Sequence, residues 1–502
     1  MPDASEAFIL RKALRHANSD LHQINGDIAH VQAILDKLHL KRESLRKFTI
    51  EHNAFLAPIR RLPAEILIEI FMLCRDYYMS SFNPKQSPLL VGQVCRGWRE
   101  ITISTQKLWS SITVTHYRSS PARAKLWISR AASMPLAMVI RLDSVHRNAG
   151  KIQPVIAVLV QHSDRWKHLD LCIGDTMVPC LSSVKHRLPW LESLRIRPPG
   201  WRREVDVFEV APRLRNLILG PGFRRTWWLK VPWHQLTHLK AHVDTIAVCL
   251  ETLQLVPNLI KCTVYSESLI SHDIIPPQNI PILTFPRLRH FSILHINPNE
   301  IFMHLRLPVI RTLQVVYQGE KRKRFKPPKW FSRHSFMTLL SCSPHTLRKL
   351  VIYRLDEHED SAHIAHCLQA VPLLEELYLR GSGGWVTADL LRLLTRQANI
   401  EVLVPALEVL EINDYSIPCY HSMDMIESRW RVLEDDDDAR ARLKRLRFEM
   451  SQAEEWLVDA EILNRLRKCR QEGMVISILE VDSYYQSRDL LDPDIHHSSP
   501  FT

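Results

Sequence analysis

The chain has 502 residues, of which 46% are hydrophobic and 24% are charged, an ordinary composition for a globular protein with room for two or three domains. Its formal net charge of +12 is spread along the sequence, which favours solubility and acidic partners over dedicated nucleic-acid binding. Only 13 glycines stand beside 30 prolines, a ratio that argues against a flexible low-complexity chain.

The ten cysteines form no Cys-x-x-Cys pair, and most lie in apolar segments, as reduced core cysteines do. The N-terminus lacks the long apolar core of a secretory signal, and the apolar run 155–160 is far too short to span a bilayer. We therefore expect a protein of a reducing compartment, the cytosol or the nucleus.

Residues 6–57 carry a heptad pattern. Its two apolar rows are Leu14, Leu21, Ile28 and Leu35, and Leu10, Ala17, Ile24, Val31, Leu38 and Leu45. Such a seam favours a coiled coil. Gly26 weakens the helix by about 1 kcal/mol, and Arg42 and Thr49 break the first row. Two interpretations stay open: a homodimer through residues 10–45, or a helix that folds back on its own chain.

Residues 58–112 predict a small helical unit. Pro63 suits the first turn of a helix, where its missing N–H has no intrahelical partner to lose. The helix has two apolar rows, with Ile66 and Ile70 on one and Leu67, Phe71 and Cys74 on the other. One row can face the core, so the other is expected to bind a partner.

A second helix is predicted after a polar loop. Ser87 is a candidate cap and Pro88 a candidate first residue, and the helix has an apolar stripe made of Leu90, Val94, Trp98 and Ile101. A short turn at residues 107–109 then leads into a strand-like segment at residues 111–114.

These residues resemble the F-box, the helical module that attaches substrate receptors to the Skp-type adaptor of cullin-RING ubiquitin ligases. The matching positions are Leu62-Pro63, Glu65-Ile66-Leu67, Ile70-Phe71, Val94-Cys95, Trp98 and Leu108-Trp109. The loop at residues 77–87 is longer than in the commonest F-boxes. The alternative is an ordinary helical hairpin in a larger α domain. The resemblance implies that the adaptor is bound by Leu62, Pro63, Ile66, Ile70, Leu89, Leu90, Val94, Trp98, Leu108 and Trp109.

The rest of the chain, residues 113–483, repeats the form L-x-x-L-x-L. Clear copies begin at Leu191, Leu214, Leu347, Leu374, Leu407 and Leu443, and weaker ones at Trp166, Leu236, Leu259, Leu288 and Ile310. This spacing is typical of leucine-rich repeats, in which each strand lines a concave sheet and a return segment covers the convex side. Because the usual Asn or Cys after the last Leu is missing, we expect an irregular solenoid. Residues 484–502 are expected to form a disordered tail.

The side chains between the repeated leucines are predicted to face the concave side, because side chains alternate along a strand. From Leu191 through Leu347 one acid, Glu192, stands against eight bases: Arg195, Arg215, Lys240, Lys261, Arg289, Arg311, Arg348 and Lys349. The next two copies reverse the sign with Glu375, Glu376, Glu408 and Glu411. The eight bases are candidate contacts for an acidic or phosphorylated substrate protein. The alternative is a merely solvated face.

The sequence shows no Gly-rich phosphate loop, no GxSxG and no HExxH. The histidines between residues 358 and 366 and the acidic run 435–438 are better explained as charged loops than as metal sites. The basic run 321–324 suits an inserted loop better than a nuclear-import signal. We expect a non-enzyme without catalytic residues, metal or cofactor.

The fold prediction is therefore a mixed α/β chain: a coiled-coil-like helix, an F-box three-helix unit and an irregular leucine-rich-repeat solenoid. The resemblance implies the substrate-recognition subunit of a Skp–cullin–F-box (SCF) type ubiquitin ligase. Two alternatives are a protein-interaction scaffold outside any ligase and a repeat protein that binds nucleic acid through the basic face. No membrane partner is expected.

Overall fold

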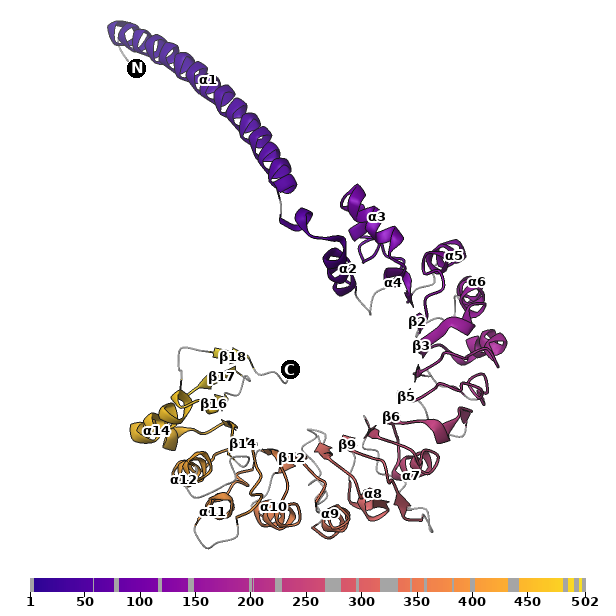
Figure 1. Ribbon diagram of the computed structural model, residues 1–502. Coiled ribbons are helices and arrows are strands. Elements are labelled where there is room, and N and C mark those ends of the chain that lie inside the picture. The colour runs from indigo at the N-terminus through magenta and orange to yellow at the C-terminus, as the bar shows by residue number, and fades with distance from the viewer. Residues whose placement is uncertain are drawn as a thin grey trace.

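The structure is a computed structural model. It describes residues 4–56, 58–75, 81–115, 120–142, 149–197, 201, 203–221, 228–266, 281–294, 298–316, 333–343, 345–355, 359–381, 383–397, 402–431, 442–481, 486–491 and 496–498. It begins with a long helix, continues through a small helical unit, and ends in a curved sheet whose convex side carries the return segments (Figure 1).

Helix α1 (Ala4–Leu56) has 53 residues and projects away from the rest of the molecule (Figure 1). The larger apolar side chains of its two heptad rows are all exposed, from 45% for Leu35 to 62% for Val31. The interpretation in which this helix folds back on its own chain is therefore wrong. The rows face solvent because no other part of the described chain packs against them.

The small helical unit consists of η1 (Pro58–Arg61), α2 (Ala64–Leu73), η2 (Val91–Gln93), α3 (Arg96–Ser104) and α4 (Gln106–Trp109). The single second helix predicted to start at Pro88 is wrong, because extended backbone at Cys95 separates η2 from α3. Ser87 does not cap it either. Its buried hydroxyl donates to the Phe71 carbonyl oxygen at 2.9 Å and so ties the loop to α2.

The remaining chain builds a sheet with the strand order β1-β2-β3-β4-β5-β6-β7-β9-β11-β12-β13-β14-β15-β16-β17-β18. The strands through β16 run parallel and stack in chain order. Their bounds are β1 (Ser111–Val114), β2 (Leu136–Arg141), β3 (Trp166–Cys172), β4 (Ser193–Ile196), β5 (Asn216–Leu219), β6 (His238–His242), β7 (Lys261–Tyr265), β9 (His290–Leu294), β11 (Thr312–Val316), β12 (Lys349–Leu355), β13 (Glu376–Gly381), β14 (Val409–Asp414), β15 (Arg445–Met450) and β16 (Val475–Val481). Strands β8 (Leu283–Thr284) and β10 (Leu305–Arg306) form a separate parallel pair.

The repeated leucines explain this register. The fourth and sixth residues of each L-x-x-L-x-L copy point into the core, as Leu194 and Ile196 do on β4 and Leu217 and Leu219 on β5. Each pairs with its counterpart on the next strand. Every such step buries apolar area, at about 25 cal/mol per Å². The strands predicted from the repeats are therefore present, in a mixed α/β leucine-rich-repeat-like solenoid.

The convex layer is uneven, as the missing Asn or Cys predicts. Towards both ends of the sheet the return segments contain α-helices. Between β4 and β6, by contrast, the described return segment contains the 3-10 turn η6 (Trp233–Gln235) as its only helical element. The convex-side elements are α5 (Pro121–Arg130), α6 (Ala149–Val160), η3 (Ser163–Arg165), η4 (Asp175–Val184), α7 (Ile246–Gln254), α8 (Asn299–Met303), α9 (Arg333–Leu340), α10 (Glu359–Gln369), α11 (Ala388–Leu394), α12 (Cys419–Trp430), α13 (Glu454–Val458) and α14 (Ala460–Gln471). No helix in the described ranges is long and apolar enough to span a membrane.

One hydrophobic core runs from Leu67 on α2 to Leu491 near the C-terminus. Aromatic side chains carry it across from the helical unit to the first repeat: the Trp109 and Trp127 rings lie 4.7 Å apart, and Phe82 lies 5.7 Å from Trp127. The Trp127 indole N–H donates to the Ser111 carbonyl oxygen on β1. The helical unit and the solenoid are therefore packed together rather than strung on a linker.

The C-terminal residues add structure that the sequence did not predict. β17 (Gln486–Asp489) pairs antiparallel with β16, and β18 (His496–Ser498) pairs antiparallel with β17. The expectation of a disordered tail over residues 484–502 is therefore wrong for these two segments. They lie at the end of the sheet, where β16 alone would leave a row of unpaired backbone groups.

Candidate adaptor-binding and ligand-binding surfaces

The first candidate surface lies on α2. Its two apolar rows divide: Leu67 and Phe71 are buried, while Ile66 is 49% exposed and Leu73 is 85% exposed. Ile70 is half-buried against the core. Because α2 buries one apolar row in the core and leaves large apolar side chains of the other row exposed to solvent, it has a face available to a partner.

Residues that follow the polar loop extend the apolar exposure. Leu90 is 47% exposed and Val94 is 56% exposed, whereas Trp98 packs its ring against Phe71 at 4.9 Å. Eight of the ten predicted adaptor contacts are therefore wholly or partly accessible: Leu62, Pro63, Ile66, Ile70, Leu89, Leu90, Val94 and Trp98.

The other two predicted contacts are a correction. Leu108 and Trp109 are 0% and 2% exposed, so neither side chain is available to an adaptor. The Trp109 indole N–H donates to the Thr102 carbonyl oxygen at 2.8 Å, and the guanidinium of Arg130 lies 4.4 Å from the ring centre. These two residues join the helical unit to the solenoid instead.

The second candidate surface is the concave face of the sheet. Cross-strand pairing brings together the third residue of every repeat copy, a row that reads His168, Ser193, Asn216, His238, Lys261, His290, Thr312, Lys349, Glu376, Val409 and Arg445. The alternation predicted from the sequence holds along this row, because each residue is exposed or half-buried between buried apolar residues.

Four of the eight predicted bases already have partners in the chain. Arg195 lies 3.6 Å from Asp170, Arg348 lies 3.2 Å from Glu375, and Lys349 lies 2.7 Å from Glu376. Arg215 donates to the Pro212 and Leu214 carbonyl oxygens at 3.3 and 3.1 Å. Neutralised or hydrogen-bonded groups have less to offer a ligand than free ones.

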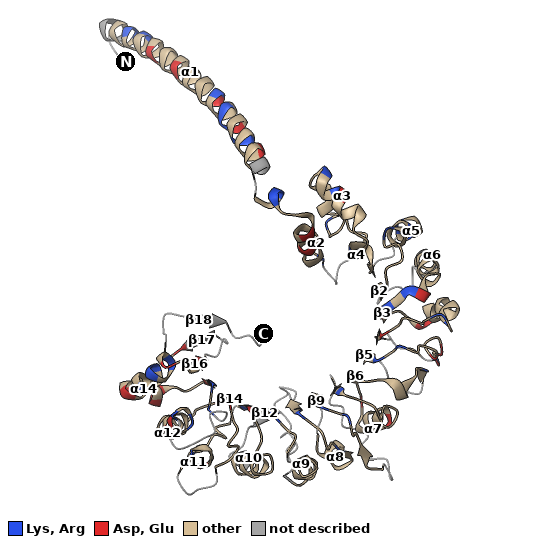
Figure 2. Ribbon diagram, viewed as in Figure 1, with Lys and Arg blue, Asp and Glu red and all other residues tan. Residues whose placement is uncertain are grey.

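The other four bases form what we call the basic patch: Lys240, Lys261, Arg289 and Arg311. All four are exposed and lie on or next to the strands β6, β7, β9 and β11, which are neighbours in the sheet. The described residues of these four strands include no acid. Lys and Arg positions mark the inner edge of the sheet around β6 and β9 (Figure 2).

Two histidines that the sequence did not single out belong to this region. The His238 Nδ1 lies 2.9 Å from the Thr237 hydroxyl, and the His290 Nδ1 lies 3.1 Å from the Thr312 hydroxyl. Burial, and after it the charges of Lys261, Arg289 and Arg311, lower the pKa of His290. Burial is the larger cause of this shift, and the three nearby cations add to it because they disfavour a further positive charge on the imidazole. The sequence did offer one sign of these two histidines: both occupy the third position of a repeat copy, which faces the concave side.

The reversal of sign after Leu347 does not produce an acidic surface. Glu375 pairs with Arg348, just before β12, and Glu376 pairs with Lys349, the first residue of β12. Glu408 lies 2.8 Å from the Lys444 ammonium. Glu411 is the exception, because its carboxylate forms no ion pair with any residue in the described part of the chain. Burial raises its pKa, and the nearby charge of Arg447 opposes that shift.

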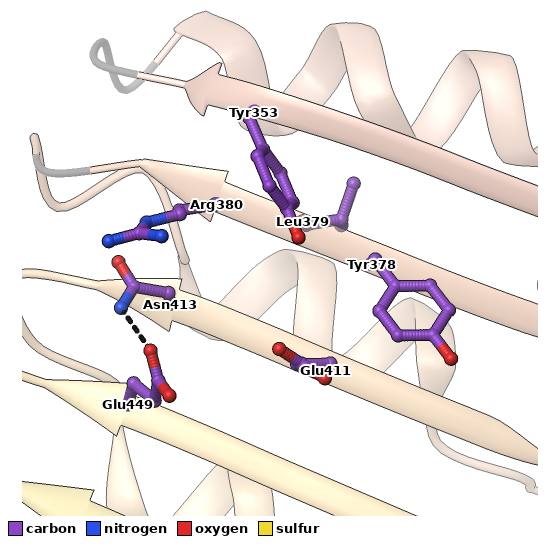
Figure 3. Close-up of a pocket in the computed structure, with 7 residues that line it drawn as sticks. All are labelled: Tyr353, Tyr378, Leu379, Arg380, Glu411, Asn413 and Glu449. Atoms are coloured by element: carbon purple, nitrogen blue, oxygen red, sulfur yellow. Dashed lines mark hydrogen bonds between the residues drawn. The ribbon is translucent and has the colours of Figure 1, made fainter. Parts of the chain in front are cut away.

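Figure 3 shows the side chains around Glu411 on β12 to β15. Asn413 donates to Glu449 at 2.8 Å, and Arg447 donates to the other Glu449 carboxylate oxygen at 2.8 Å. Tyr378 donates to Glu376 at 3.0 Å. Against the opposing effect of burial, hydrogen bonds from Lys349 and Tyr378 lower the pKa of Glu376. Apart from Glu411, the polar side chains named here are therefore hydrogen-bonded to one another rather than available to a ligand.

Within the described ranges, no group of His, Cys, Asp or Glu side chains is arranged to hold a metal ion. His366 lies on α10 with its Nδ1 2.7 Å from the Ala362 carbonyl oxygen. The acidic run 435–438 and the basic run 321–324 lie outside the described residues.

Comparison with known proteins bears on both surfaces. Residues 59–115 match the family model described as F-box-like, so this part of the chain is an F-box-like domain. A solved structure that matches is a crystal structure of a TLR13–ssRNA13 complex, with 13% sequence identity and a TM-score of 0.22. The match covers 57% of this chain and 53% of that chain, about half its length. No curated protein matches the sequence.

The class of the protein follows from the chain's own features. It joins an F-box-like domain to a leucine-rich-repeat-like solenoid of parallel strands, preceded by a long helix. F-box domains bind Skp-type adaptors.

Proposed function

We propose that this chain is the substrate-recognition subunit of an SCF-type ubiquitin ligase, with the F-box-like domain docked on a Skp-type adaptor and the solenoid holding a target protein. The observation that carries the proposal is the F-box-like domain at residues 59–115, whose α2 keeps Ile66 and Leu73 exposed. Purified chain and adaptor should associate at micromolar concentration or below, as calorimetry would measure. A chain that does not bind adaptor at such concentrations would overturn the proposal.

The mechanism of the proposed subunit is proximity. Holding a target beside a ligase-bound ubiquitin donor raises the effective concentration of the target's lysines, and this step needs no catalytic residue in the receptor. The chain is accordingly proposed as a non-enzyme that acts without a cofactor, in the cytosol or the nucleus.

The proposed target is acidic or phosphorylated where it meets the basic patch. Of the eight predicted bases, Lys240, Lys261, Arg289 and Arg311 have no ion pair in the described chain, and they lie together on or next to neighbouring strands. His238 and His290, each hydrogen-bonded to a threonine hydroxyl, lie on two of the same strands. Charge-assisted hydrogen bonds to carboxylate or phosphate oxygens are about twice as strong as neutral ones, so this region is preferred over the self-paired cluster near Glu411.

Reversing three charges of the patch tests this part of the proposal. The triple variant Lys261→Glu, Arg289→Glu and Arg311→Glu is expected to bind a degenerate phosphopeptide library at least about a hundredfold more weakly than the wild type, since each reversed contact is worth roughly 1 kcal/mol or more. Fluorescence anisotropy measures this loss. Circular dichroism should be unchanged, because the three side chains are exposed.

The matched control reverses three exposed bases of the convex helices: Lys125→Glu on α5, Arg392→Glu on α11 and Lys468→Glu on α14. It changes the net charge equally and should leave binding within about twofold. Equal losses of binding in both triple variants would show that net charge, and not the patch, causes the loss. Undiminished binding by the patch variant would show that the patch does not contact the ligand. A preference for single-stranded oligonucleotides over phosphopeptides would favour a nucleic-acid-binding repeat protein instead.

A further inference from the structure

The exposed face of α1 has a defined geometry. Leu38, Arg42, Leu45 and Thr49 line one shallow groove along the helix, with Lys41 and Arg46 at its sides. In heptad terms, Arg42 and Thr49 occupy a positions with Leu14, Leu21, Ile28 and Leu35. Leu38 and Leu45 occupy d positions with Leu10, Ala17, Ile24 and Val31. A seam of this kind is completed by another helix with the same period.

A parallel pairing of two copies conflicts with the charges. Equivalent a positions face each other in a parallel dimer, so Arg42 would face Arg42 inside the seam. At the side of the seam, Lys41 would lie against Arg46 of the second copy. Ala17 would face Ala17 and leave the seam underpacked. The Arg42 guanidinium lies 3.3 Å from Glu43 on its own helix, but two such cations that face each other in a dry contact are still strongly unfavourable.

An antiparallel pairing removes these conflicts. In an antiparallel pair, a positions face d positions of the second copy. In the register in which Leu14 faces Leu45, Leu21 faces Leu38 and Ile28 faces Val31. The long side chain of Arg42 then lies opposite the small Ala17. Lys41 lies beside Asp20 of the second copy, and the symmetry of the dimer makes this charge pair twice. One like-charged contact remains, between Arg11 and Arg46 near each end.

We propose that α1 pairs with α1 of a second copy in the antiparallel orientation, in the register that places Leu14 opposite Leu45. The paired helices form a rod about 80 Å long, from 53 residues at about 1.5 Å each. Each F-box-like domain follows directly on α1, so the two lie at opposite ends of the rod. The inference does not depend on ligase function.

Self-association is tested first by mass. Light scattering of the full chain is expected to give twice the 58.5 kDa of one chain. Replacing both Ile24 and Ile28 by Asp puts four carboxylates in the central layers of the rod and should give the single-chain mass. A wild-type chain that is monomeric at tens of micromolar overturns the proposal.

Orientation is tested by cysteine cross-linking of two single variants, Leu14→Cys and Leu45→Cys. The antiparallel register is expected to give a disulfide-linked dimer when differently tagged variants are co-expressed, and none when either is expressed alone. Wild-type chain is the control for its own ten cysteines, of which Cys74 is exposed. Cross-links within each variant alone would establish a parallel dimer, and a dimer without any cross-link would refute this register.

A charge swap gives an independent readout of opposite sign for the two orientations. Lys41→Glu puts a carboxylate beside Asp20 in the antiparallel dimer and should weaken dimerisation about tenfold. In a parallel dimer the same change pairs with Arg46 and strengthens it. Adding Asp20→Lys should restore the antiparallel dimer. Lys47→Glu, on the outer face of the helix, is the control and should change the dimer Kd less than about twofold.

Discussion

Combining Leu62→Ala, Pro63→Ala and Ile66→Asp is expected to abolish binding of the Skp-type adaptor while the solenoid keeps its melting transition. The three residues stand at the start of α2, where Pro63 and Ile66 are exposed and Leu62 is half-buried. Ile66→Asp places a carboxylate in what should be a dry contact, and central interface anchors lose about 2 kcal/mol or more each when removed. Calorimetric titration with adaptor would measure the loss.

Because one core joins the F-box-like domain to the first repeat, damage to folding must be separated from damage to binding. Ile66→Asp alone is the cleaner variant, since Leu62 packs partly on the core. Leu126→Asp is the matched control: it replaces a side chain that is 51% exposed on α5, outside the F-box-like domain, and should bind adaptor normally. Adaptor affinity that survives the triple variant would show that α2 is not the docking helix.

Arg429→Met is expected to lower the free energy of unfolding by roughly 3 kcal/mol or more. Arg429 on α12 is 0% exposed. Its guanidinium donates to the carbonyl oxygens of Leu394 at 2.6 Å, Leu403 at 2.7 Å and Val404 at 3.1 Å. Burial lowers the pKa of Arg429 to about 9, so the side chain stays charged at neutral pH. Methionine supplies the apolar stem and leaves the three carbonyl groups without their donors.

Urea denaturation measures this change, and hydrogen exchange should place the loosened region around residues 394–404. Arg431→Met is the control, because Arg431 is 51% exposed and pairs with Glu427 at 3.0 Å near the surface. Solvent screening limits such a pair to about 0.5 kcal/mol. Similar losses in the two variants would mean that the buried hydrogen bonds are not what holds this connection.

The repeated leucines were enough to predict the strands, because each strand's inward pattern is local. The fourth and sixth residues of a copy, such as Leu410 and Ile412, are buried wherever the copy occurs. Three strands near the C-terminus were not predicted: β16 lacks a leading Leu pair, and β17 and β18 run antiparallel. The break before α3 was not predicted, because the apolar side-chain pattern continues through Val94 and Cys95. The helical backbone, however, is interrupted at Cys95, which is extended.

The candidate sites were harder to predict, since exposure and pairing depend on neighbours far away in the sequence. Leu108 and Trp109 match an adaptor-binding motif, yet both are buried, and Trp127 on the next helix packs against the Trp109 ring. Apart from Glu411, the predicted acids after Leu347 are paired with bases 27 or 36 residues away, such as Glu376 with Lys349 and Glu408 with Lys444. Only the register of the sheet identifies which charges remain free. Arg429 gave no signal, because it lies within an otherwise ordinary amphipathic helix.

The shared core between the F-box-like domain and the solenoid sets a length scale. Ser81, in the loop that precedes η2, hydrogen-bonds both ways with Thr113 on β1, with its backbone N–H donating at 2.9 Å and its hydroxyl accepting at 2.8 Å. From β1 to the basic patch the sheet advances five strands to β6, at about 4.8 Å per strand, or roughly 24 Å. Under the proposed ligase function, a target bound at the basic patch would be held at this fixed distance from the F-box-like domain. Adding or deleting one repeat between β1 and β6 should then change which of its lysines is modified.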